Sequence, residues 1–91
     1  MAEHRIEKGQ VHYKWDNAQR PVVDIESGDI VHCETNEVTD GQVVPGSPAS
    51  ALGTIDFARL YPLAGPVFVR GAEPGDTLQV DVLSLETLDW G

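Results

Sequence analysis

The residues that could carry chemistry in this chain are three histidines, one cysteine and scattered carboxylates. His4, His12 and His32 form no His-x-His pair and lack the four-residue helical spacing that many zinc sites use. His32 and Cys33 are neighbours on a predicted strand, so their side chains point to opposite faces and would not share one ion. A blue-copper site needs Cys, two His and an axial ligand, and no such set is recognisable. The spacing therefore predicts no local metal motif.

Two residues are candidate site elements. His12, with Asp16 close behind it in the sequence, has the composition of a tuned general base, although a partly exposed strand residue is the alternative. Asp40 begins the run Asp-Gly-Gln in a long loop, where polar groups often serve function, although a simple Asp-Gly turn is the alternative. Cys33 lies in apolar company on a strand, so we expect a buried, inert thiol.

Length and charge restrict the class of protein. Ninety-one residues suit one small domain, and six Lys and Arg against fifteen Asp and Glu give a net charge of −9. Such a chain would repel phosphate backbones and anionic lipids, so we expect neither nucleic acid nor a membrane as a partner. The single cysteine allows no internal disulfide, and no apolar run reaches the roughly 20 residues of a membrane span. With no apolar stretch at the start to act as a signal peptide, we expect a cytoplasmic protein.

The hydrophobic pattern is mostly that of short strands. Alternating or β-branched runs bounded by Gly, Pro or polar turn residues predict strands over 11–15, 22–25, 30–35, 66–70 and 77–85. The short Gly-containing loop between the second and third runs predicts that these two form a hairpin. The last run alternates most clearly, with Leu78, Val80 and Val82 on one face.

Proline and glycine interrupt the middle of the chain. Residues 36–53 carry them so densely that neither a ladder nor a helix can continue, which predicts a long irregular loop. Thr54 is expected to cap one short helical turn over 55–60, with Asp56 near its positive end. The predicted fold class is therefore all-β: a partial β-sandwich or barrel of short strands with a long irregular loop and one short helical turn.

A short motif occurs twice. Glu26-Ser27-Gly28-Asp29 and Glu73-Pro74-Gly75-Asp76 share the form Glu-x-Gly-Asp, and each is followed by an apolar run. One interpretation is that the same turn chemistry is used twice, because Gly supplies a positive φ and Asp bonds its own backbone. The other is that two similar β units pack as the halves of a sandwich or barrel.

A longer segment resembles the acetamidase/formamidase family. The run from Tyr61 to Leu78 contains Gly-Pro-Val, Gly-Ala and Pro-Gly-Asp in the family's order, and the chain ends on Asp-Trp-Gly as a family strand does. Upstream, the residues around His12–Asn17, Pro21-Val22, Ser27–Val31 and Asp40–Gln42 also match. The resemblance covers residues 11–91, and the Gly-Ala-x-Pro-Gly-Asp run is its most specific part.

The resemblance implies an amidohydrolase that splits short linear amides into a carboxylate and ammonia. It implies a longer β-rich enzyme with a divalent metal, often zinc, whose acidic and histidine-bearing motif has no counterpart in this sequence. We therefore expect residues 1–91 to be a single β-rich segment, the N-terminal portion of a longer amidase and inactive alone. The expected partners are a small amide substrate and the rest of the same polypeptide, and a homo-oligomer is compatible with both. His12 and Asp40 are then candidates for a pocket wall.

A binding module is the alternative function. A small acidic sandwich or partial barrel could bind a partner chain without catalysis. If the chain is instead part of a cut sandwich, we expect it to expose an unusually large apolar surface, because one core face is left bare. A cupin-like domain is a third interpretation, based on the Pro-Gly-Asp turn, but the cupin His-x-His pair is missing.

Overall fold

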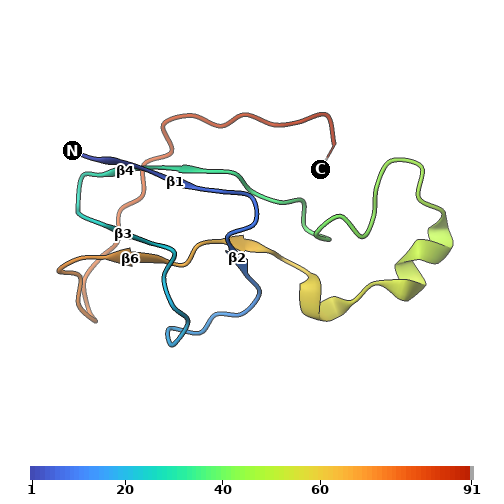
Figure 1. Ribbon diagram of the computed structural model, residues 1–91, viewed down its shortest axis with the longest axis horizontal. Helices are drawn as coiled ribbons and strands as arrows, with labels where there is room; N and C mark the ends of the chain where they lie inside the picture. Colours follow the sequence, from blue (N-terminus) through green and yellow to red (C-terminus); the bar gives the residue numbers. More distant parts are fainter. Residues whose placement is uncertain (91) are drawn as a thin grey trace.

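The computed structural model describes residues 1–90, which form short strands and two 3-10 helices (Figure 1). In chain order these elements are β1 (Glu3–Ile6), β2 (Val11–His12), β3 (Val23–Ile25), β4 (Ile30–Cys33), η1 (Ala49–Thr54), η2 (Phe57–Arg59), β5 (Leu63–Ala64) and β6 (Val67–Val69). The prediction of an all-β class is confirmed. No helix within the described part of the chain is long and apolar enough to cross a bilayer.

The strands pair over long distances in the sequence. β1 pairs with β4 in parallel, with Glu3 opposite Ile30, and β3 pairs with β6 in parallel, with Val23 opposite Val67. β2 and β5 form a short antiparallel pair. The predicted hairpin between 22–25 and 30–35 is therefore wrong, because β3 and β4 each use a distant partner. The turn between them redirects the chain from one pair to the other (Figure 1).

The predicted positions of the strands agree with the structure better than their predicted lengths do. β2, β3, β4 and β6 lie within predicted runs, but each is shorter than predicted, since its pairing ends where the partner diverges. β1 was not predicted, because Ile6 is its only large apolar residue. The run 77–85 is not a strand: it is extended, and it pairs with nothing within residues 1–90.

The helical turns also differ from expectation. The loop after β4 is irregular only as far as Pro48, since η1 begins at Ala49, and η2 occupies three residues of the predicted turn. Asp56, not Thr54, caps η2, because its side chain accepts a hydrogen bond from the Ala58 N–H at 3.0 Å. The Thr54 hydroxyl donates backwards to the Ala51 carbonyl.

The two Glu-x-Gly-Asp motifs form the same turn. In each, the Asp N–H donates to the Glu carbonyl at 3.0 Å, and the Glu N–H donates to the Asp carboxylate at 2.9 Å. Gly28 and Gly75 have φ of +93° and +98°, the left-handed conformation that glycine adopts at low cost. The interpretation that turn chemistry is used twice is therefore confirmed.

The core is very small and the chain is open. Among the described residues Ile6 is the only buried large apolar side chain, with no exposed surface. The accessible surface is 7496 Å². A compact protein of 9.9 kDa would expose only about 5200 Å². Large apolar side chains from Leu78 to Trp90 remain exposed, as the sequence leads one to expect of a β segment without its second layer.

We expect Ile6→Ala to lower the free energy of unfolding by about 2–5 kcal/mol, since it removes the one fully buried side chain and leaves a cavity. Leu52→Ala is the matched control, because Leu52 is exposed on η1 and its truncation should change stability by less than about 0.5 kcal/mol. Urea denaturation followed by far-ultraviolet circular dichroism measures both. Equal effects of the two substitutions would contradict a core centred on Ile6.

Candidate functional site

Asp40 is the centre of the densest side-chain hydrogen-bond cluster among residues 1–90. Its Oδ2 accepts from the Tyr13 hydroxyl at 2.7 Å and from Arg59 Nη2 at 3.3 Å. Its Oδ1 accepts from Asn36 Nδ2 at 3.0 Å. Arg59 Nη2 also reaches the Asp40 carbonyl at 3.2 Å. One carboxylate thereby joins the chain after β2, the loop after β4 and the 3-10 helix η2.

The backbone places this carboxylate through a tight turn. Asp40 has a φ of +56° and Gly41 one of +80°, and Asp tolerates this left-handed region better than most residues. Gln42 then holds Asp56, the cap of η2, with two bonds: its Oε1 accepts from the Asp56 N–H at 2.7 Å, and its Nε2 donates to the Asp56 carbonyl at 3.1 Å. The Asp-Gly-Gln run is thus more than a simple turn, because it fixes η2 and with it Arg59.

The cluster shifts the ionisation of its members. The hydrogen bonds from Tyr13 and Asn36, with the nearby Arg59 guanidinium, lower the pKa of Asp40 from its usual 3.8. The bond to the Asp40 carboxylate raises the pKa of Tyr13 above its usual 10.0, because the phenolate would be repelled. The buried Oδ1 of Asn36 accepts no hydrogen bond within the described residues.

His12 is not a member of the Asp40 cluster. Its Nδ1–H donates to the Lys14 carbonyl at 2.9 Å, which leaves Nε2 as the free ring nitrogen. Asp16 does not pair with it, since the Asp16 carboxylate accepts from the Ala18 N–H. His12 is half-buried on β2, so the alternative of a partly exposed strand residue describes it.

A second cluster, around Asp29, was not predicted. The Asp29 carboxylate accepts from the Ala2 N–H at 3.0 Å, from His4 Nε2 at 2.8 Å and from the Glu26 N–H at 2.9 Å. Bonds from Glu26 and Ala2, and then His4, hold the pKa of Asp29 well below its usual range. The signal in the sequence was the Asp of the repeated turn, but nothing local indicated that β1 would lie against it.

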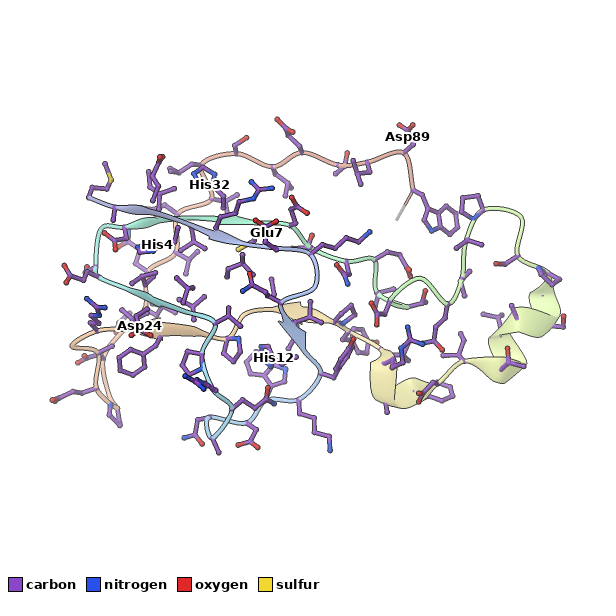
Figure 2. The ribbon with its side chains drawn as sticks, in the orientation of Figure 1. His4, Glu7, His12, Asp24, His32 and Asp89 are labelled. Atoms are coloured by element: carbon purple, nitrogen blue, oxygen red, sulfur yellow. The ribbon has the colours of Figure 1, made fainter. Side chains whose placement is uncertain are left out.

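Figure 2 shows His4 and His32 beside β1 and β4 and His12 beside β2, so the histidines do not gather at one centre. Within residues 1–90 no group of three or more His, Cys, Asp or Glu side chains is placed to hold a metal ion. The residues present therefore do not fit the divalent metal that the family resemblance implies.

A broad groove lies between β4 with its following loop on one side and residues 76–90 on the other. Its volume is about 2640 Å³, and Asp40 and Cys33 are among the residues that line it, whereas His12 is not. The expectation of a buried Cys33 is wrong: the residue is exposed, because within residues 1–90 β4 pairs with β1 alone and no second layer covers this pair. Whether Asp40 or His12 faces a substrate stays a prediction.

Comparison with known proteins gives one consistent result. A family model described as "Acetamidase/Formamidase family" matches residues 2–91. The chain is 34% identical over 86 residues to a formamidase of Methylophilus methylotrophus, covering 91% of this chain and 21% of that protein. It is 35% identical over 74 residues to an acetamidase of Mycolicibacterium smegmatis, covering 81% of this chain and 18% of that protein.

A solved structure agrees with these sequence matches. The crystal structure of an acetamidase from Bacillus halodurans superimposes with a TM-score of 0.71 at 33% identity, over 79% of this chain and 24% of that one. The chain spans about a fifth of the length of the curated relatives it matches.

The Asp40 cluster predicts that the stability of the folded chain depends on pH at both the acidic and the alkaline end of the range. Because the pKa of Asp40 is lowered, its stabilising contribution is complete above pH 3.8 and is lost as the pH falls through the lower folded value. Because the pKa of Tyr13 is raised, its contribution is complete below pH 10.0 and is lost as the pH rises through the higher folded value. Ultraviolet titration of the phenol should therefore show Tyr13 ionising above pH 10.0.

Asp40→Asn should return the Tyr13 titration toward its ordinary value, since a neutral amide repels the phenolate less while Asn still tolerates the left-handed φ. Glu37→Gln is the matched control, because it removes a carboxylate from the same loop that does not bond Tyr13. If both variants moved the Tyr13 pKa equally, a general charge effect and not the Asp40 contact would be responsible.

Proposed function

The chain belongs to the acetamidase/formamidase family, and from this membership we propose that it forms part of an amidohydrolase acting on short linear amides. In that reaction water gives its hydroxyl to the acyl carbon, the carbon–nitrogen bond breaks, and the nitrogen leaves as ammonia with the proton of the water. The observation that carries the proposal is the extent of the family match, which runs over residues 2–91 and is not confined to one motif. The names of the relatives, formamidase and acetamidase, support the same substrate class.

We propose that residues 1–91 supply scaffold and one wall of the substrate pocket, with chain outside them completing the enzyme. The small share of each relative that the chain covers supports this division. The Asp40 cluster suits a wall, because it holds the loop at the end of the groove through three side chains from separate segments. His12 is the second wall candidate, but it does not line this groove, so its candidacy rests on its Nε2, which forms no hydrogen bond within residues 1–90.

A divalent metal, zinc by family resemblance, is proposed for the complete enzyme, with ligands outside residues 1–91. We assign no step of the reaction through it, because the described residues do not fit a metal site. The small amide and the remaining polypeptide are the proposed partners, with self-association compatible, and the cytoplasm is the proposed location. The acidic charge and single cysteine support that location.

A non-catalytic acidic β module is the second candidate function. The observation that favours it is the exposed apolar run from Leu78 to Trp90, which a partner chain could cover. The activity of a longer chain that carries this segment separates the two functions, since only the amidase proposal requires turnover there.

We expect the 91-residue chain alone to hydrolyse neither formamide nor acetamide, because amide hydrolysis needs an activated water and a stabilised oxyanion. The measurement is ammonia release with and without added zinc, with the full-length Methylophilus methylotrophus formamidase as the positive control. Zinc-dependent turnover by the short chain above a heat-denatured sample would contradict the expectation and place ligands within residues 1–91.

In a full-length chain that carries this segment, we expect His12→Ala and Asp40→Asn each to lower turnover about 10- to 100-fold, since small misplacements at a pocket wall are costly. Zinc content, measured by mass spectrometry, should stay at the wild-type level. Glu73→Gln is the control, because Glu73 is an exposed carboxylate that does not line the groove, and it should keep full activity. Loss of zinc together with activity would show that the two residues do not act at a pocket wall.

A further inference from the structure

The segment after the second Glu-x-Gly-Asp turn repeats the segment after the first, but it has no partner strand. The first turn leads into β4, which pairs with β1, whereas residues 77–90 continue in extended form without entering a sheet within the described residues (Figure 1). Leu78, Val80 and Val82 alternate along this run and are 72%, 72% and 76% exposed. Its backbone therefore presents an open edge with an apolar face.

We call the first Glu-x-Gly-Asp turn with β4 the first unit, and the second turn with residues 77–90 the second unit. The partner of the first unit is β1, which shows what groups such an edge binds. Where β1 meets the turn, Ala2 donates its N–H to Asp29 Oδ1 and accepts the Ile30 N–H on its carbonyl at 2.9 Å. His4 donates to Asp29 Oδ2, and Arg5 pairs with Glu34. An N–H donor, an imidazole and a cation along one strand thus match two carboxylates on the other.

The second unit carries the same acceptors at a spacing of 47 residues. Asp76 corresponds to Asp29, Thr77 to Ile30 and Asp81 to Glu34. Asp76 Oδ2 is occupied by the turn, but within residues 1–90 its Oδ1 accepts no hydrogen bond and the Thr77 N–H donates none. Asp81 is exposed and accepts only from the Gln79 side chain. These are the groups that β1 satisfies in the first unit.

Charge favours a cationic occupant. After Arg70 the sequence contains no Lys or Arg, while Glu73, Asp76, Asp81, Glu86 and Asp89 follow. Pairing with a second copy of residues 77–90 would place carboxylates opposite carboxylates, and this repulsion between like charges is unfavourable. A groove with a volume of about 2640 Å³ lies between this run and β4.

We propose that residues 76–82 are an acceptor edge for a polypeptide strand with the chemistry of β1. The occupant runs parallel to residues 77–82, presents an N–H to Asp76 Oδ1 and a carbonyl to the Thr77 N–H, and places Arg or Lys opposite Asp81 three residues later. Main-chain hydrogen bonds supply the affinity and the ion pair sets the register. The proposal goes beyond the amidase role and does not depend on it.

The test uses the 91-residue chain and a synthetic peptide of residues 1–8 blocked at both ends, which carries the β1 pattern. Nuclear magnetic resonance should show the peptide shifting the amide signals of residues 76–82. Asp81→Lys should weaken binding about three- to tenfold, and a peptide with Arg5→Glu should recover that loss on the Asp81→Lys chain. Glu86→Lys is the control, because it makes the same charge change beyond the edge, and it should weaken binding less.

Four results would overturn the proposal. The first is no shift of residues 76–82 at millimolar peptide, and the second is a shift confined to β4, which would mean that the peptide only displaces β1. The third is equal weakening by Asp81→Lys and Glu86→Lys, which would indicate diffuse attraction without register. If the 76–82 signals instead moved with protein concentration alone, the occupant would be a second copy, and the cationic partner strand would be wrong.

Discussion

The rest of the structure depends on the Asp29 carboxylate, which closes its own turn and holds β1 at the same time. Its side chain is only 9% exposed and accepts three hydrogen bonds, two of them from β1 and the residue before it. This contact brings β1 alongside β4, and that pairing buries Ile6, which among residues 1–90 is the one large apolar side chain with no exposed surface. In a chain with so little core, directed polar contacts set which strands meet, and apolar burial follows from them.

Local features of the fold could be predicted from the sequence, and long-range ones could not. The turns at Gly28 and Gly75 and the positions of β2, β3, β4 and β6 follow from neighbouring residues, so glycine placement and alternation predict them, whereas β1 and β5 escaped prediction and the predicted strand over 77–85 is wrong. The partner of β3 lies 44 residues away in the sequence and that of β4 lies 27 residues away, and no local pattern encodes either pairing. The exposure of Cys33 was missed for the same reason, since it depends on whether a second layer covers β4.

The candidate site was predicted in part. Asp40 was selected because a polar residue in a long loop often serves function, and the structure makes it the centre of a cluster. Its partners Tyr13 and Arg59 were not predicted, because they come from segments before and after the loop. His12, chosen with a neighbouring carboxylate in mind, bonds a main-chain carbonyl instead. Family membership, and not the geometry of residues 1–90, indicates the chemistry.

The parallel pairing of distant segments also orders events during synthesis on the ribosome. β1 finds its partner as soon as β4 has emerged, because both lie within the first 33 residues. β3 emerges before β4 but must wait for β6, with the loop and both 3-10 helices synthesised in between. Nascent chains of this sequence therefore pass through a stage in which β1 and β4 are paired while β2 and β3, which lie between them in the sequence, are still unpaired. Translational pausing in the region of the long loop would prolong that stage.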